Sequence, residues 1–340
     1  MLLSSLSVML TTLMSPAQLF GALNELKALN QRSPNQAISY YQNINSHIPT
    51  APSKGSMEIH LSGMEAAIRT DTHIMVRSAL KVTSQHDWVR SVEDGEFKIF
   101  VPMAIYHRRI GDHSYAEYLN KCALTYAKSE QQLSKVVSNL SVIYRYTEQH
   151  NKAIQLLKEQ LNVVSTKSIK AGLYNNLGNF YQLQSRYIDA KSVYKKAFLI
   201  HSMNNNAFLS SSVGLNLLKT MISTSNWSDF SRFEPAVSQF VEQSEHPDFI
   251  AYLYWQKLIV SVKHQDKKLT AEQVKKLKES MPLLHTTEVS PSITEFVNLI
   301  NHSELANAWR ILIDQPHEPI REQVVSRIPV ALPCTKNNAA

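Results

Sequence analysis

The chain has 340 residues, of which 44% are hydrophobic and 19% are charged, and its formal net charge at pH 7 is +7. These proportions are ordinary for a globular protein. Only 8 residues are Gly, and neither Gly-x-Gly-x-x-Gly nor Gly-x-x-x-x-Gly-Lys-Ser/Thr occurs, which argues against a nucleotide-binding sheet with a phosphate loop. No stretch approaches the roughly 20 apolar residues that a membrane helix needs, so we expect no transmembrane segment in the mature chain.

The first seventeen residues have the outline of a secretory signal peptide. Residues 2–14 are uncharged and mostly apolar, and Ser-Pro-Ala at 15–17 offers small residues before a cut at Gln18. No Lys or Arg precedes Lys27, so the basic start of such a signal is missing. We expect removal of residues 1–17 and a periplasmic or secreted protein. The alternative is an amphipathic first helix that is retained in a cytoplasmic protein.

Residues 18–95 are predicted to form an N-terminal helical region. Helical periodicity predicts four helices in and next to this region, at residues 16–30, 35–48, 57–69 and 72–83. Ser33-Pro34 separates the first two, and Glu93-Asp94-Gly95 is a turn signal at the end of the region.

A run that opens on Asn-Leu then occurs three times. The copies begin at Asn139, Asn176 and Asn216, at intervals of 37 and 40 residues, and a ring follows each Asn eleven positions later. Self-similarity at such intervals is typical of stacked helix pairs, which serve more often as binding surfaces than as catalysts. The sequence therefore predicts an all-α fold with a repeat array at residues 96–237.

The middle copy is the clearest of the three. Its pattern residues are Tyr174, Leu177, Gly178, Tyr181, Tyr187, Ala190, Tyr194 and Ala197. This stretch resembles a tetratricopeptide repeat, in which small residues let two helices cross closely while aromatic residues fill the space around the crossing. The flanking copies keep the large apolar positions but replace some of the small ones, so we interpret them as degenerate repeats.

The resemblance implies a right-handed α-solenoid of antiparallel helix pairs, with degenerate pairs at both ends. Beyond the array, residues 238–314 are predicted to form C-terminal helical pairs with helices at 249–264, 270–280, 293–300 and 304–313. Residues 315–340 carry four prolines and are predicted to be a flexible tail.

The resemblance also implies that the first helix of each repeat lines an inner, concave face that grips an extended peptide. Carried onto this sequence, the partner-binding candidates are Asn139, Arg145, Asn175, Asn176, Asn179, Gln182 and Asn216. An amide carries both a donor and an acceptor, so a row of Asn can pair with a peptide main chain. The alternative is that these Asn side chains are simply solvated or bond the adjoining repeat.

Basic residues near the row, Arg145, Lys135 and Lys219, would attract an acidic partner or a carboxylate terminus. For any one of them a plain solvated surface charge is the simpler explanation. A further group of Lys residues lies at 263–278, but no binding sheet with interleaved aromatic residues accompanies it. We therefore expect no specific nucleic-acid binding, and the sequence leaves the oligomeric state open.

Sequence motifs for metal binding and catalysis are weak. The chain has 13 His residues but no His-Glu-x-x-His and no Cys-x-x-Cys, so we predict no metal site. Ser192-x-x-Lys195 has the spacing of a Ser/Lys nucleophile, yet it lies inside the second helix of the clearest repeat. We predict no catalytic residue, no cofactor and no enzymatic activity.

The two Cys residues lie in different settings. Cys122 belongs to an apolar helical pattern, where a small buried hydrophobe is expected, and Cys334 belongs to the Pro-rich tail. A bridge would have to fasten the tail back onto the helices, so we predict two unpaired thiols.

Together these features predict a scaffold that binds a peptide or protein partner in a tetratricopeptide groove. The sequence is similar to the helical-repeat sensory regions of bacterial signalling proteins, which favours a role in signalling or envelope assembly in the periplasm. The alternative is a cytoplasmic regulatory module that controls a transcription or signalling partner.

Overall fold

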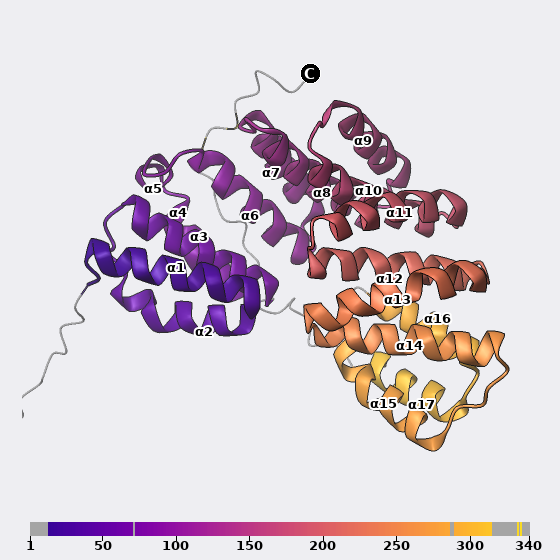
Figure 1. The fold of residues 1–340 in the computed structure, drawn as a ribbon. Coiled ribbons are helices and arrows are strands. Elements are labelled where there is room, and N and C mark those ends of the chain that lie inside the picture. The colour runs from indigo at the N-terminus through magenta and orange to yellow at the C-terminus, as the bar shows by residue number, and fades with distance from the viewer. Residues whose placement is uncertain (1–12, 71, 286–288, 315–331, 333, 335–340) are drawn as a thin grey trace, which may run out of the picture. The chain divides into compact units, whose positions relative to one another are not determined.

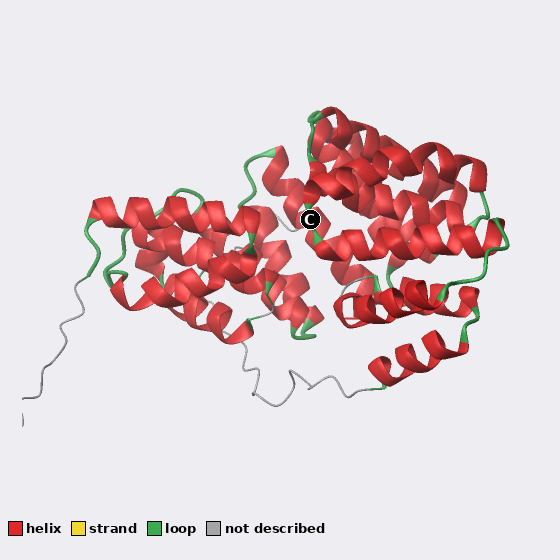
Figure 2. Cartoon of the chain, turned by 60° about the horizontal axis from the view of Figure 1, so that its bottom comes forward, coloured by secondary structure: helices red, strands yellow, loops and turns green. Residues whose placement is uncertain are grey.

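The computed structural model describes residues 13–70, 72–285, 289–314, 332 and 334. These residues form 17 α-helices and one short 3₁₀-helix, and no strand occurs among them, which confirms the all-α prediction (Figure 2). The chain divides into two compact units, which are treated separately below. Unit 1 is Met1–Thr147 with Arg321–Ala340, and unit 2 is Glu148–Ile320.

Unit 1 contains the first eight α-helices (Figure 1). They are α1 (Pro16–Arg32), α2 (Pro34–Ile44), α3 (Lys54–Arg69), α4 (His73–Thr83), α5 (His86–Arg90), α6 (Gly95–Arg109), α7 (His113–Thr125) and α8 (Glu130–Tyr146), with the 3₁₀-helix η1 (Asn45–His47) after α2. The four helices predicted between residues 16 and 83 are confirmed, whereas the five-residue α5 was missed. Its length gives too little periodicity to detect.

Capping residues explain why the first helices begin where they do. Ser15 forms a capping box with Gln18, and Pro16 occupies the first position of α1, where a missing N–H has no cost. Ser33 caps α2 by accepting a hydrogen bond from the Gln36 N–H, and it is followed by Pro34. The break predicted from Ser33-Pro34 is therefore the start of a new helix. Residues 1–12 of the predicted signal peptide lie outside the described residues.

A disulfide joins Cys122, buried on α7, to Cys334 across 212 residues of sequence. The prediction of two unpaired thiols was wrong. A sequence separation carries no information on spatial distance, and nothing in the tail composition indicated that residue 334 returns to α7. Leu332 is also buried in this unit. The rest of the predicted tail, residues 315–331, 333 and 335–340, lies outside the described residues.

Unit 2 is a regular array of helices. It contains α9 (His150–Val163), α10 (Lys167–Leu183), α11 (Tyr187–Met203), α12 (Ala207–Ser223), α13 (Trp227–Ser244), α14 (Pro247–His264), α15 (Ala271–His285), α16 (Ser290–Ile300) and α17 (Ser303–Ile313). The helices from α10 to α14 start at 20-residue intervals, so the repeat of two helices is 40 residues long. The helices predicted between residues 249 and 313 are confirmed.

Each turn in the regular part contains one residue in the left-handed region, two positions before the next helix. These residues are Ser185, Asn205, Ser225 and Glu245, with φ between 50° and 56°. One left-handed residue reverses the chain direction after a helix and satisfies some of its last carbonyl groups. The constant turn keeps the helices in the same phase from one repeat to the next.

The helices of unit 2 form two rows. In the inner row α10, α12, α14 and α16 each contact the next, and in the outer row α11 and α13 pair with α10 and α12. Gly178 permits the closest approach in the first pair, because a Cβ there would lie 2.5 Å from the Tyr194 ring. In the second pair that role belongs to Gly214, whose Cβ would meet Val237 at 2.7 Å.

Candidate functional site

Four of the predicted partner-binding residues come together on the inner row of unit 2. Asn175, Asn179 and Gln182 lie on α10 and Asn216 on α12, and all four are partly exposed. The hydroxyl group of the buried Tyr194 on α11 lies 2.6 Å from Asn179 Oδ1 and 3.1 Å from Gln182 Oε1. We call these five residues the amide cluster.

The short contact fixes the orientation of the Asn179 amide. A separation of 2.6 Å suits O–H···O and is shorter than N–H···O bonds, so Tyr194 donates to the Asn179 oxygen. Asn216 Nδ2 then donates to Asn175 Oδ1 at 3.2 Å and more weakly to Asn179 Oδ1 at 3.5 Å. The oxygens of Asn175 and Asn179 are thus occupied within the protein, and their Nδ2 groups face solvent without a hydrogen bond among the described residues.

Gln182 supports Tyr194 from the other side. Tyr194 has one hydroxyl hydrogen, which goes to Asn179, so the 3.1 Å contact is a hydrogen bond when Gln182 presents its Nε2 group. In either orientation one buried polar atom of Gln182 has no partner within the described residues. The geometry therefore gives Gln182 the role of holding the Tyr194 hydroxyl group in place.

Burial fixes the protonation state of the central tyrosine. Loss of solvent, with a smaller effect of Tyr252, raises the pKa of Tyr194 well above its usual value of 10. Burial likewise raises the pKa of Tyr252 on α14 to about 12. Both rings therefore remain neutral at physiological pH, and the Tyr194 hydroxyl stays a donor.

The repeat position of Asn216 recurs 40 residues later at Gln256 of α14. Gln256 is fully buried, and its Nε2 donates to the main-chain oxygen of Leu215 at 2.9 Å. Asn216 and Gln256 thus each bond the inner helix of the preceding repeat. The sequence analysis missed Gln256, although a search at the 40-residue interval would have found it. In these two residues the amide fastens neighbouring repeats.

The other three candidates do not belong to the amide cluster. Asn176 on α10 is partly exposed and makes no side-chain hydrogen bond to a described residue. Asn139 and Arg145 lie on α8 in unit 1, where the guanidinium of Arg145 lies 5.3 Å from the ring centroid of Tyr146. The Nδ2 group of Asn139 is buried without a hydrogen-bond partner in the described part of the chain.

Charge near the amide cluster is balanced. Lys219, one turn after Asn216 on α12, lies 3.5 Å from Glu295 Oε2 on α16. Ser223 donates to the other carboxylate oxygen at 3.4 Å. Lys219 is therefore engaged within the array, and the inner row presents amide groups beside a paired charge.

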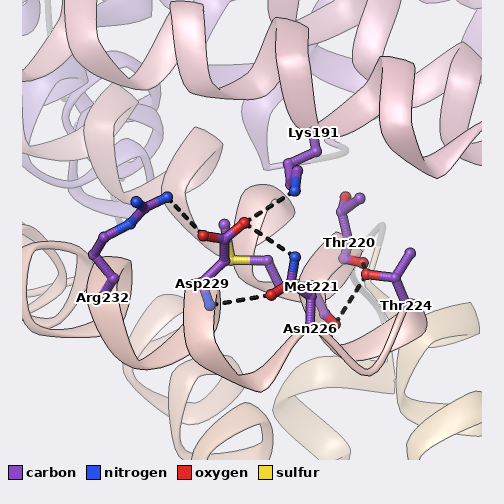
Figure 3. Close-up of polar contacts among 7 residues, drawn as sticks. All are labelled: Lys191, Thr220, Met221, Thr224, Asn226, Asp229 and Arg232. Carbon is purple, nitrogen blue, oxygen red and sulfur yellow. Dashed lines mark hydrogen bonds and ion pairs between the residues drawn. The ribbon is translucent and has the colours of Figure 1, made fainter.

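A second polar centre links the outer row (Figure 3). Asp229 on α13 accepts hydrogen bonds from Lys191 on α11 at 2.9 Å, from Arg232 at 2.6 Å and from Asn226 at 3.0 Å. Asn226 caps α13 by accepting from the Asp229 N–H. The Lys191 hydrogen bond is the largest cause that lowers the pKa of Asp229. This centre joins two successive outer helices and so serves the architecture.

A hollow of about 530 Å³ lies between α15 and α17, away from the amide cluster. Its charged lining includes Lys278 and Glu304, which form an ion pair at 2.7 Å. Among the described residues no group of three or more His, Cys, Asp or Glu could hold a metal ion. No helix among them is long and apolar enough to cross a membrane.

These features define a helical-repeat protein of the solenoid class, in which helix pairs stack into two rows. Residues 171–203, which cover α10 from its second turn and all of α11, match the tetratricopeptide repeat family. This match confirms the resemblance of the middle copy to a tetratricopeptide repeat. No curated protein matches the chain as a relative.

Three solved structures illustrate the fold. Aspartyl phosphate phosphatase F from Bacillus subtilis is similar with a TM-score of 0.63 and 10% identity, over 94% of this chain and 99% of that one. A signal transduction ATPase with a tetratricopeptide repeat sensor from Pyrococcus horikoshii gives 0.56 and 13%, over 84% and 44%. The human IFIT1 dimer with m7Gppp-AAAA gives 0.54 and 14%, over 87% and 71%. At such identities the similarity concerns the fold alone.

Proposed function

We propose that the protein is a non-catalytic scaffold that holds a peptide or protein partner against the inner helices α10 and α12. The observation that carries this proposal is the orientation of the amide cluster. Internal hydrogen bonds use the oxygens of Asn175 and Asn179, so both side chains offer N–H donors to solvent. Donors one turn apart on a helix suit the carbonyl oxygens of an extended main chain.

The buried hydroxyl group of Tyr194 makes this surface rigid. A side chain that is already held in its binding orientation loses less conformational freedom when a partner arrives. The balanced pair of Lys219 and Glu295 adds no net charge beside the amides. The proposed site therefore recognises main-chain groups, and an acidic character of the partner is not required.

The experiment is peptide selection from a random display library on the purified protein. We expect enriched peptides to bind the wild type and to lose about thirtyfold in affinity to Asn175→Ala/Asn179→Ala, because two hydrogen bonds of about 1 kcal/mol each are removed. The matched control is Asn204→Ala/Asn298→Ala, which removes two exposed amides elsewhere in unit 2. Failure to enrich peptides, or equal affinity for both variants, would contradict the proposal.

We propose a periplasmic location, with signalling or envelope assembly as the setting. The disulfide between Cys122 and Cys334 supports it, because such bonds persist in oxidising compartments and are rare in the cytosol. The fold similarity to a tetratricopeptide repeat sensor is compatible with a signalling role.

A cytoplasmic regulatory module is the second candidate, and one observation favours it. A cut after residue 17 would remove Ser15 and Pro16, which begin α1 in the structure. It would also place a new positive terminus at the positive end of that helix. Mass spectrometry of the mature amino terminus separates the two: a start at Gln18 supports export, and retention of Ser15 supports the cytoplasmic module.

A further inference from the structure

A cluster of rings lies at an edge of unit 2, outside the amide cluster. Phe208, at the start of α12, contacts His246, the residue before α14, and Phe249 in the first turn of α14, with ring centroids 5.6 and 5.1 Å apart. His246 and Phe249 lie 4.6 Å from each other. The starts of α12 and α14, two successive helices of the inner row, are thus joined by three rings.

Exposed apolar side chains flank these rings in the sequence. Met203 at the end of α11 is 81% exposed, Phe208 is 50% exposed and Ile250 is 48% exposed, while Leu209 is exposed to a smaller extent. We call the set of Met203, Phe208, Leu209, His246, Phe249 and Ile250 the ring edge. A group of exposed apolar side chains on a soluble protein marks an interaction site more often than an isolated exposed residue does.

The sequence segments that carry the ring edge differ in charge from the chain as a whole. Residues 198–213 and 241–253, which carry it, contain no Lys or Arg, although the chain has 35 such residues and a net charge of +7. The second segment contains three acidic residues, Glu242, Glu245 and Asp248. We call these three residues the acidic rim.

Two members of the acidic rim oppose the stability of the fold. Glu242 and Glu245 lie at the carboxyl end of α13, where the negative end of the helix dipole disfavours a carboxylate and where no basic residue lies in the last turn. Glu245 also adopts the left-handed conformation with φ of 51°, which Gly would adopt at lower cost. Acidic side chains at these positions are better explained by a binding role than by folding.

The third carboxylate is partly withdrawn from water. Burial raises the pKa of Asp248, while His246 acts in the opposite direction. A cation that arrived from outside would offset this loss of solvation, and Arg is suited to it because a planar guanidinium can both pair with a carboxylate and stack on a ring.

We propose that the ring edge and the acidic rim bind an apolar segment of a partner protein that carries Arg. The apolar side chains of the segment cover Met203, Phe208 and Ile250, and its guanidinium groups pair with the acidic rim and stack on the rings. This surface is separate from the amide cluster on the inner row, and binding there does not depend on the function proposed above.

The experiment uses the full chain and a fluorescent peptide with the sequence Leu-Arg-Phe-Leu-Arg, compared with the same peptide in which citrulline replaces both Arg. Citrulline keeps the shape of Arg but has no charge. We expect fluorescence anisotropy to show about tenfold tighter binding of the Arg peptide at low salt, with a preference that declines as salt is added. Equal binding of the two peptides would overturn the proposal.

Two variants separate the contribution of the acidic rim from that of the apolar side chains. Glu242→Gln/Glu245→Gln/Asp248→Asn is expected to abolish the preference for Arg, and Phe208→Ser is expected to weaken both peptides. Ile188→Ser is the matched control, because Ile188 is 82% exposed on α11 and outside the ring edge. Circular dichroism checks that each variant is folded. If the charge-neutral variant keeps the preference for Arg, the proposal is wrong.

Peptide binding at the inner row, or binding of a second copy of the chain at the ring edge, would give different results. Asn175→Ala/Asn179→Ala is expected to bind the Arg peptide as the wild type does, so loss of binding there would place the peptide on the inner row and overturn the proposal. Sedimentation velocity tests for a second copy of the chain. A concentration-dependent dimer that Phe208→Ser abolishes would show that the edge binds another copy, and would also overturn it.

Discussion

The hydroxyl group of Tyr194 donates to Asn179 Oδ1 across 2.6 Å, and the ring of the same tyrosine occupies the space that a side chain at position 178 would need. One residue of the outer helix therefore determines both how closely α10 and α11 pack and which way an inner amide points. The packing of this repeat and the orientation of its candidate binding residue therefore depend on the same tyrosine side chain.

The hydroxyl of Tyr194 can be removed while its ring is kept. We expect Tyr194→Phe to lower the free energy of unfolding by about 1–2 kcal/mol, because Asn179 and Gln182 lose a buried partner. Urea unfolding followed by circular dichroism measures the change. Tyr174→Phe is the control, since the Tyr174 ring lies near Lys196 and its hydroxyl makes no hydrogen bond within the described residues. Equal stability of the two variants would show that the Tyr194 hydroxyl has no such role.

Two glycines of α10 are expected to respond in opposite directions to the same change. Gly178→Ala should cost about 1–3 kcal/mol, because the new methyl group would press against the Tyr194 ring. Gly172→Ala should stabilise the protein by roughly 0.5–1 kcal/mol, because nothing lies within 4 Å of the added Cβ and Ala favours the helix. Thermal unfolding of both variants is the measurement. A gain in stability for Gly178→Ala would contradict the close crossing.

The Asp229 centre predicts a loss of stability in acid. The pKa of Asp229 is lowered in the folded protein, so its contribution is complete above the unfolded value of about 4 and declines as the pH falls through the lower folded value. We expect Asp229→Asn to cost about 1–2 kcal/mol at pH 6 and much less at pH 2, as measured by urea unfolding.

The equivalent residue one repeat earlier provides the control for this prediction. Within the described part of the chain, Asp189 pairs with Arg186 of its own turn alone, at an exposed site. We expect Asp189→Asn to change stability by less than about 0.5 kcal/mol at either pH. A similar loss in both variants would mean that the link from Asp229 to Lys191 contributes nothing beyond the local turn.

His60 predicts a second pH effect, in unit 1. Burial against Tyr41 and Trp88 lowers the pKa of His60 to about 4. Only the unfolded chain binds a proton between pH 6.5 and 4, so this stability is complete above 6.5 and falls by about 3 kcal/mol as the pH drops to 4. The difference between wild type and His60→Gln, which keeps an acceptor for Tyr41, isolates this residue. Parallel pH profiles for the two proteins would exclude a buried neutral His60.

The disulfide predicts sensitivity to reductant. Cys334→Ser, or treatment with dithiothreitol, is expected to lower the free energy of unfolding by about 2–4 kcal/mol, since the bond closes a long loop. The variant itself is the control, because dithiothreitol should leave it unchanged. Two titratable thiols in the unreduced wild type, measured after unfolding in denaturant, would show that the bond is absent.

The sequence predicted the helices well because their signals are local. Caps such as Ser33 and the repeated pattern around Gly178 are encoded within a few residues, and both were identified. The contacts that organise the candidate site are not local. Asn216 meets Asn175 only because two inner helices lie side by side, and Tyr194 was interpreted as a space-filling ring since a sequence pattern does not show where a hydroxyl points.

The errors have a similar origin. The pairing of Cys122 with Cys334 depends on the path of the tail, which composition does not determine. Gln256 was missed since the third repeat had lost the family pattern and its continuation was not searched at the 40-residue interval. The 40-residue spacing of the helices is thus kept in repeats that no longer show the residue pattern of the family.

Because of that interval, a whole repeat can be removed from the array or added to it. Since α12 begins at Ala207 and α14 at Pro247 after turns of the same kind, removal of residues 207–246 would connect α11 directly to α14 without changing the phase of any later helix. Gln256 would then take the place of Asn216 next to Asn175. A shortened chain of this design would have one repeat fewer, and the protein could be lengthened by duplication at the same boundaries.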